Sequence, residues 1–233
     1  MSGMSGQLLA MHGWAGDSRA WEPWRLAAEQ RGWSWQCGER GYGSLPPRLP
    51  AWESGSKPGR RAVLAHSLGL HLLPPAVLAA ADAVVLLASF AAFVPAGRDG
   101  RPLRAALGAM EARLAAGLAA DLLADFLRQA AAPDPADLLP PGPGSEPLEA
   151  AGIERLRSDL ALLGRVGALP AAFPPAARVL LVEAEDDRIV AAASRAALRR
   201  ALSEATVWPI AGAGHSLLRA PLIEPVLTWL EAA

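Results

Sequence analysis

The sequence predicts an α/β fold: a mostly parallel sheet with helices on both faces and one helical insertion. Short β-prone apolar runs alternate with helical stretches in the first and the last part of the chain. Between residues 98 and 165 the strand pattern stops, and amphipathic stretches rich in alanine and leucine replace it. We therefore expect a core of residues 1–97 and 166–233 that is interrupted by a helical lid insertion, residues 98–165.

The expected strands are short runs that are either apolar throughout or alternate between apolar and polar residues. They cover residues 7–11, 33–37, 61–64, 83–87, 178–183 and 206–210. The expected helices cover residues 21–31, 103–114, 118–127, 149–163, 194–201 and 223–230, with a further helix directly after Ser67. Two segments rich in proline and glycine, residues 45–59 and 133–147, are expected to lack regular structure.

Length and composition favour one large domain. A chain of 233 residues can bury a sizeable core. Although 52% of its residues are apolar, no stretch approaches the roughly 20 uninterrupted apolar residues of a membrane helix. Residues 1–6 lack the features of a signal peptide, and the lone Cys37 excludes an internal disulfide. The lone cysteine agrees with a reducing cytoplasm, so we expect a cytoplasmic protein. With a net charge of −1 we expect neither nucleic acid nor a membrane as partner.

The stretch Ala65-His66-Ser67-Leu68-Gly69 carries the candidate nucleophile. Ser67 lies between an expected strand and an expected helix, where a nucleophile elbow places its serine. The elbow holds the serine backbone in a strained turn, so that the hydroxyl stands clear of the sheet. The residues two before and two after must be small because strand and helix cross closely there, and Ala65 and Gly69 meet this requirement. A plain β-to-α turn is the alternative interpretation.

A serine hydroxyl is a weak nucleophile at neutral pH, and histidine is a suitable base to activate it. The candidate base is His215, in a glycine-rich loop between the last expected strand and the last expected helix. A surface loop histidine is the alternative interpretation. The other histidines have different expected roles: His66 projects away from Ser67, His71 packs in the elbow helix, and His12 shapes the loop after the first strand.

An acid should orient this histidine, and it should come from the loop after the preceding strand. Four acids lie there: Glu183, Glu185, Asp186 and Asp187. Glu183 still belongs to the strand, whereas Asp187 comes just before the apolar pair 189–190, which can anchor it. We therefore expect Asp187 to be the orienting acid, and a solvated acidic loop is the alternative.

Together these pieces resemble the α/β-hydrolase family along nearly the whole chain. The matching stretches are His12-Gly13-Trp14, Arg40-Gly41-Tyr42-Gly43, the elbow 65–69, residues 184–190 and Gly214-His215. The order serine, aspartate, histidine is also that of the family. There are two departures: Ala65 replaces the first glycine of the elbow, and Ala184 stands where a glycine often opens the acid loop.

Within this family the sequence is most similar to the pimeloyl-[acyl-carrier protein] methyl ester esterases of biotin synthesis. The likeness lies in residues 12–16, 66–70 and 152–160. It implies a serine carboxylesterase in which Ser67, His215 and Asp187 form a catalytic triad. It also implies that the backbone N–H groups of Trp14 and Leu68 hold the oxyanion. No metal and no organic cofactor are implied.

The resemblance further implies a small acyl ester as substrate, carried on an acidic acyl carrier protein, and an apolar pocket roofed by the insertion. Arg98, Arg101 and Arg104 recur every three residues and are the candidate carrier-binding residues, since they could share a helix face. The insertion as a whole is not basic, because residues 98–165 hold eight arginines and ten acids. Three alternatives remain: a broad-specificity carboxylesterase or lipase, a thioesterase or acyltransferase, and a ligand-binding receptor with little turnover.

Overall fold

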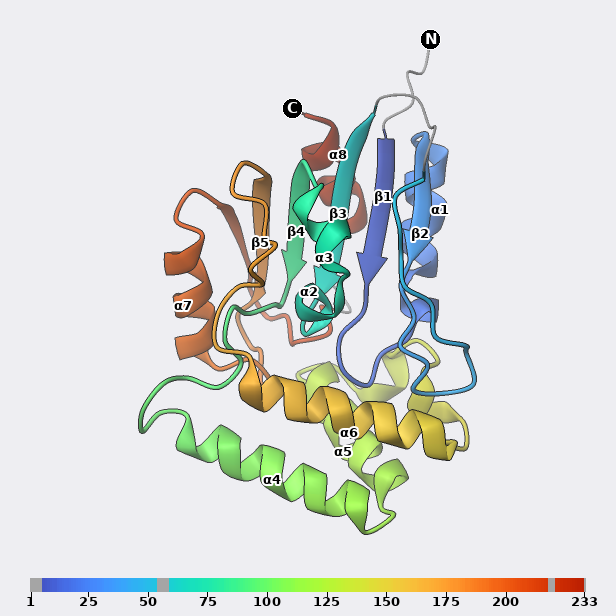
Figure 1. Cartoon of the computed structure of the whole chain (residues 1–233), viewed down its shortest axis with the longest axis vertical. Helices are drawn as coiled ribbons and strands as arrows, with labels where there is room; N and C mark the ends of the chain where they lie inside the picture. Colours follow the sequence, from blue (N-terminus) through green and yellow to red (C-terminus); the bar gives the residue numbers. More distant parts are fainter. Residues whose placement is uncertain (1–5, 54–58, 218–220, 233) are drawn as a thin grey trace.

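The computed structural model describes residues 6–53, 59–217 and 221–232. In these ranges the chain forms a six-stranded sheet in the order β2-β1-β3-β4-β5-β6, and each strand is parallel to its neighbours (Figure 1). The strands are β1 (Gly6–Met11), β2 (Trp33–Cys37), β3 (Arg60–His66), β4 (Ala83–Leu87), β5 (Arg178–Ala184) and β6 (Thr206–Ile210). They lie where the sequence predicts strands. Most of the N-terminal stretch used for the signal-peptide expectation and part of the 45–59 connection fall outside the described residues.

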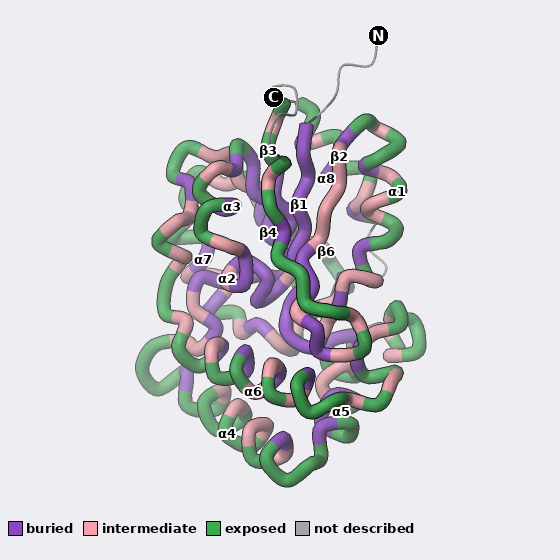
Figure 2. The backbone as a smooth tube through the Cα atoms, turned by 45° about the vertical axis from the view of Figure 1, so that its right-hand side comes forward, coloured by how far each residue is buried: buried purple, intermediate pink, exposed green. Residues whose placement is uncertain are grey.

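Helices cover both faces of the sheet, as expected. One face packs against α1 (Glu22–Gln30) and α8 (Ile223–Glu231), and the other against α2 (Gly69–Leu72), α3 (Pro75–Ala79) and α7 (Ala192–Ala201). Alternate residues of each central strand point to opposite faces, so both faces of β4 are apolar and its five residues are buried. Figure 2 shows these buried central strands between the more exposed helices.

The insertion lies across the carboxyl edge of the sheet (Figure 1). It contains α4 (Arg101–Ala115), α5 (Ala119–Ala131) and α6 (Ala150–Arg165), with two short 3-10 helices, η2 (Ala136–Leu138) and η3 (Pro143–Ser145). We call these elements together the roof. Figure 2 shows α4 as mostly exposed or half-buried, and Leu114 is the buried residue of that helix. Segment 133–147, expected to be irregular, holds η2 and η3, which are single turns.

Several helix boundaries differ from the prediction: α5 and α6 extend past their expected ends, α7 begins two residues early, and two further differences involve prolines. A 3-10 turn, η1 (Ser18–Trp21), precedes α1, so the helix expected over 21–31 begins as an α-helix only at Glu22; Pro23 lies in its first turn, where a missing N–H costs little. Asp17 caps η1, its carboxylate accepting the N–H of Arg19 at 2.9 Å. Helix α4 begins two residues earlier than predicted, with Pro102 in its first turn.

One buried acid attaches α6 to the core. Asp159 is 3% exposed and accepts two hydrogen bonds from the Arg40 guanidinium, both at 2.8 Å, and one from the Tyr42 hydroxyl at 2.5 Å. Gly152 lies so close to the same loop that a Cβ on it would be 2.1 Å from the Tyr42 carbonyl oxygen. Side chains and backbone therefore both hold α6 against the loop that follows β2.

Candidate active site

Ser67 occupies the turn between β3 and α2 with a positive φ of 54°. A backbone angle of this kind is uncommon for a residue with a side chain and indicates local strain. The Ser67 N–H donates to Leu87 O at 2.9 Å, and the Ser89 hydroxyl donates to Ser67 O at 2.7 Å, so the turn is held from two sides. A Cβ on Gly69 would lie 2.3 Å from Met11 O, so it is the end of β1 that requires the glycine.

Ser67, His215 and Asp187 form one chain of hydrogen bonds. Ser67 Oγ lies 3.0 Å from His215 Nε2, and His215 Nδ1 lies 2.9 Å from a carboxylate oxygen of Asp187. Because an ionised carboxylate can only accept, Nδ1 donates to Asp187, and Nε2 is left to accept from the hydroxyl. Ser67 is 6% and His215 2% exposed. The arrangement can move the hydroxyl proton to His215 and thus make Ser67 a nucleophile.

Asp187 and Asp186 have different surroundings. Asp187 Oδ1 accepts the N–H groups of Ile189 at 2.8 Å and Val190 at 2.9 Å. Burial by itself raises the pKa of Asp187, but the charge of His215 and these hydrogen bonds outweigh burial and hold the pKa below its ordinary value. The Asp186 side chain is exposed, while its backbone N–H donates to the carbonyl of residue 213, in the loop that carries His215.

The two amides expected to hold an oxyanion lie next to Ser67. Leu68 follows it directly, and Gly13 is so close that a Cβ on it would be 2.8 Å from Ser67 Cβ. In the part of the chain that the structure describes, neither the Leu68 nor the Trp14 N–H donates to another protein group. Gly13 O accepts from His12 Nδ1 at 2.9 Å, which fixes the peptide plane that carries the Trp14 N–H. Free N–H groups beside a nucleophile suit a developing negative charge.

His66 has a contact that the sequence analysis missed. Its Nε2–H donates to the carbonyl oxygen of His215 at 3.0 Å, and the two rings lie 5.0 Å apart. Burial, with the nearby charge of His215, lowers the pKa of His66 to about 4, so its ring is neutral near pH 7. His66 therefore holds the backbone of the loop that carries His215. His71 packs as expected, stacked on Phe90.

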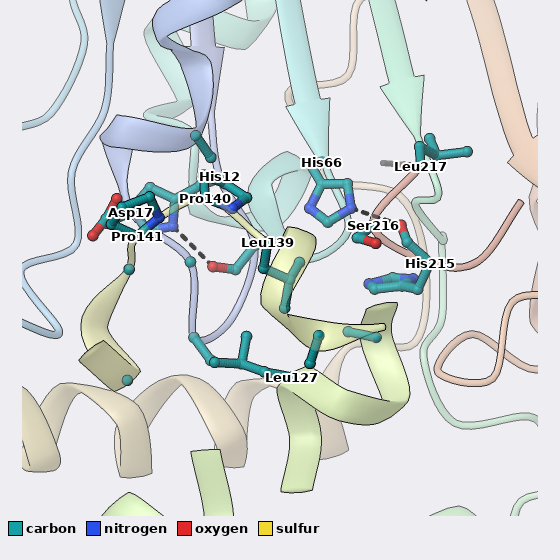
Figure 3. A pocket seen from close by; sticks show the side chains of 18 of the residues that line it. His12, Asp17, His66, Leu127, Leu139, Pro140, Pro141, His215, Ser216 and Leu217 are labelled. Carbon is teal, nitrogen blue, oxygen red and sulfur yellow. Dashed lines mark hydrogen bonds between the residues drawn. The ribbon is translucent and has the colours of Figure 1, made fainter. Parts of the chain in front are cut away.

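A cavity of about 890 Å³ opens beside His215 (Figure 3). Its walls come from the segment that runs from the loop after β1 through η1 to the start of α1, from the loop before α8, and from the roof between α5 and η3. The wall is mostly apolar, with Trp14, Trp21, Trp24, Phe126, Leu127, Leu138, Leu139, Leu217, Leu222 and Ile223. Arg128 is the cation of the described lining, and it already pairs with Asp125. This wall suits an uncharged apolar ligand, and segment 133–147 supplies part of it.

The three candidate carrier-binding arginines lie at the start of α4. Arg98 precedes the helix, whereas Arg101 and Arg104 lie in it, so the expectation that all three share a helix face is wrong for Arg98. All three are exposed, and Arg104 donates to Gly97 O at 2.7 Å. Among the described residues, none of the three forms an ion pair. They do not line the cavity beside His215.

Neither a metal cluster nor a membrane span is found in residues 6–53, 59–217 and 221–232. No group of three or more His, Cys, Asp or Glu side chains in these ranges is placed to hold a metal ion. No helix in the same ranges combines the length and apolar character needed to cross a bilayer.

The sequence matches no protein-family model and no curated protein sequence. Solved structures are similar in fold. They include the esterase EaEST from Exiguobacterium antarcticum (TM-score 0.68, 12% identity, 97% of this chain and 92% of that chain covered). The enol-lactonase from Burkholderia xenovorans LB400 is also similar (TM-score 0.66, 13% identity, 99% of this chain and 93% of that chain covered). So is the bottromycin epimerase BotH (TM-score 0.62, 13% identity, 98% of this chain and 90% of that chain covered). The chain therefore has the predicted α/β-hydrolase fold. An epimerase among these structures shows that the fold alone does not define a reaction.

Proposed function

We propose that the protein is a serine carboxylic ester hydrolase that works through an acyl-enzyme on Ser67. The observation that carries this proposal is the hydrogen-bonded chain from Ser67 through His215 to Asp187, with distances of 3.0 Å and 2.9 Å. The strained turn at Ser67 and the two free amides beside it support the same chemistry.

In the first half of the reaction, Ser67 Oγ adds to the ester carbonyl carbon while its proton moves to His215 Nε2. The carbonyl oxygen becomes an oxyanion, which the N–H groups of Leu68 and Trp14 hold. When the tetrahedral intermediate collapses, the bond to the alcohol breaks and His215 returns the proton to the departing oxygen. Asp187 keeps the ring oriented and stabilises its positive charge throughout.

The second half releases the acid. Water loses a proton to His215 Nε2 and adds to the acyl carbon, and a second tetrahedral oxyanion forms at the same two amides. Its collapse breaks the bond to Ser67 Oγ, which takes the proton back from His215. Each atom that enters as ester and water leaves as acid and alcohol, and the enzyme returns to its initial state.

As the substrate we propose the methyl ester of the pimeloyl group on acyl carrier protein, with methanol as the leaving alcohol. The support is the sequence likeness at residues 12–16, 66–70 and 152–160. The apolar cavity is compatible with an uncharged linear acyl chain, and the exposed Arg98, Arg101 and Arg104 with an acidic carrier. A broad-specificity carboxylesterase is the second candidate, because the arginines lie away from the cavity and the chemistry does not need them.

The proposed nucleophile is tested by Ser67→Ala. We expect hydrolysis of p-nitrophenyl butyrate to fall at least about 1,000-fold, because loss of a triad member leaves mainly binding and oxyanion stabilisation. The matched control is Ser194→Ala in α7. It removes another buried serine hydroxyl, which donates to Phe93 O at 2.8 Å. This control should keep kcat. Activity of Ser67→Ala above a few per cent of the wild type would exclude Ser67 as nucleophile.

A further inference from the structure

We infer that the side chain of Trp14 is a positioning residue: by binding two helices of the roof, it directs its own backbone N–H toward an oxyanion on Ser67. The inference deepens the proposed ester hydrolase and rests on it, because it concerns an amide of the same site. On this account the roof covers the cavity and also helps to form the oxyanion hole, the pair of N–H groups of Trp14 and Leu68.

The indole is anchored at two points that both belong to the insertion. Trp14 Nε1–H donates to the carbonyl oxygen of Leu156 in α6 at 2.9 Å. Its ring meets the ring of Phe126 in α5 edge to face, with 4.8 Å between centroids and 88° between planes. Trp14 is 5% exposed and Leu156 is fully buried, so neither contact competes with water. Since Asp159 fixes α6 to the core, the acceptor of the indole hydrogen bond is itself held in place.

The backbone around Trp14 needs such an anchor. Ala15 has a φ of 60°, a conformation that is unfavourable for alanine and persists only when its surroundings enforce it. The Trp14 N–H and the Gly13 carbonyl belong to the same peptide plane. Gly13 O accepts from His12 Nδ1 at 2.9 Å and from the Gly16 N–H at 3.3 Å, and these bonds hold the Gly13 end of that plane. The indole contacts hold the Cα end of the same unit. The plane is thus fixed from both ends, one by the core and one by the roof.

The consequence for catalysis follows from the geometry of hydrogen bonds. The hydrogen bond from an N–H that tilts or moves loses strength steeply. Negative charge develops on the substrate oxygen on the way to the tetrahedral intermediate and is absent from the bound ester, so this hydrogen bond matters most in the transition state. Loosening Trp14 should therefore lower kcat and leave KM nearly unchanged. A side chain that serves only packing should instead change thermal stability and leave the kcat of the folded enzyme intact.

The test variant is Trp14→Phe, which keeps an aromatic ring against Phe126 and removes the hydrogen bond to Leu156 O. We expect kcat for p-nitrophenyl butyrate to fall about tenfold, less than the 100-fold or more that follows loss of a whole oxyanion donor. KM should stay within about twofold. A trifluoromethyl ketone, whose adduct with Ser67 carries an oxyanion, should bind about tenfold more weakly, while the matching methyl ketone should bind as before.

The matched control is Trp52→Phe. Trp52 Nε1–H also donates to a backbone carbonyl, that of Val77, at 3.0 Å, outside the cavity beside His215. The control removes an equivalent hydrogen bond, so its kcat and its affinity for the trifluoromethyl ketone should equal those of the wild type. Should Trp14→Phe fold poorly, Phe126→Leu weakens the second anchor instead, and we expect it to lower kcat in the same direction.

Three results would overturn the inference: an unchanged kcat in Trp14→Phe, a loss confined to KM, or an equal loss of kcat in Trp52→Phe. In each case the wild type would still hydrolyse the ester through Ser67, so the proposed function would stand. If instead the wild type does not hydrolyse the ester, or Ser67→Ala retains activity, the proposed function fails. The two failures are therefore distinguishable.

Discussion

At the scale of single residues, only one of two adjacent acids accepts a hydrogen bond from His215. Asp187 accepts from His215 and from two backbone N–H groups, whereas the carboxylate of Asp186 is exposed. The difference comes from the turn that follows β5, which directs one side chain inward. Neighbouring residues of the same type can thus differ completely in role.

We expect Asp187→Asn to lower kcat by roughly 1,000-fold or more, because an amide in place of the carboxylate favours the wrong tautomer of His215. Asp186→Asn, the matched control, should stay within about threefold of the wild type, since surface substitutions away from such contacts have small effects. Steady-state kinetics with p-nitrophenyl butyrate measures both variants. Equal losses, or the reverse order, would show that the orienting acid was wrongly identified.

His66 makes stability depend on pH. Its pKa is lowered to about 4 in the folded protein, against about 6.5 for an unperturbed histidine. Between these values the unfolded chain binds a proton that the folded protein does not, so the free energy of unfolding rises with pH. His66 therefore contributes full stability above pH 6.5, and at most about 3 kcal/mol is lost as the pH falls to 4.

We expect His66→Gln, which retains a side-chain N–H donor but cannot be protonated, to show a flatter decline of stability than the wild type between pH 6.5 and 4. Urea unfolding at several pH values in this window measures the two slopes. His71→Gln is a useful comparison, because burial lowers the pKa of His71 as well, while its ring bonds Phe90 O away from His215. Parallel slopes for the wild type and His66→Gln would contradict the prediction.

At the scale of elements, α6 makes several of the contacts between the core and the roof. Four of its residues contact the core. Gly152 lies against Tyr42 O, and Arg155 donates to Gly41 O. Leu156 O accepts the indole N–H of Trp14, and the Asp159 carboxylate accepts from Arg40 and Tyr42. These residues belong to the stretch 152–160, which carries part of the sequence likeness. Its residue types are explained by the attachment of the helix to the loop after β2.

We expect Asp159→Ala to lower the free energy of unfolding by about 3 kcal/mol, because it leaves Arg40 and Tyr42 without their buried acceptor. The matched control is Asp125→Ala in α5, which removes an exposed carboxylate paired with Arg113 and Arg128 and should change stability little. Chemical unfolding of both variants measures the difference. A similar loss in both would mean that Asp159 does not anchor the roof.

At the scale of the whole molecule, charge is distributed rather than concentrated. The net charge of −1 provides no overall attraction for an acidic partner, so binding of a carrier protein would depend on a local cluster. The exposed arginines at the start of α4, Arg98, Arg101 and Arg104, are the candidates for that cluster. Arg101 and Arg104 lie in α4 and Arg98 just before it, all at exposed positions where a large partner has access; Figure 1 shows α4 on the outer side of the roof.

We expect the enzyme to cleave the methyl ester of the pimeloyl carrier protein far better than the same ester on a small thiol, because remote contacts position the ester. Changing Arg98, Arg101 and Arg104 together to alanine should weaken the carrier-bound reaction and its salt sensitivity, yet spare p-nitrophenyl butyrate. The control removes the same charge from three ion-paired surface arginines, Arg25, Arg113 and Arg157.

If the control variant loses as much carrier-bound activity as the α4 variant, total charge rather than this cluster is responsible. If the wild type does not distinguish the carrier from the small thiol, the broad-specificity carboxylesterase becomes the better account of the protein.

Much of this protein is determined by its sequence alone. Apolar runs and helical periodicity predict the strands and most helices, because burial of alternate or spaced side chains leaves a local pattern. Parallel strands end at one edge of their sheet, so Ser67, Asp187 and His215, each placed after a strand, are expected to meet there. What the tertiary structure alone decides are contacts between distant segments that lack a local pattern. The bonds from Trp14 to Leu156 O and from His66 to His215 O span 142 and 149 residues of the chain. Such bonds depend on the final packing of the roof and loops on the core, because neither partner is chosen by the residues around it.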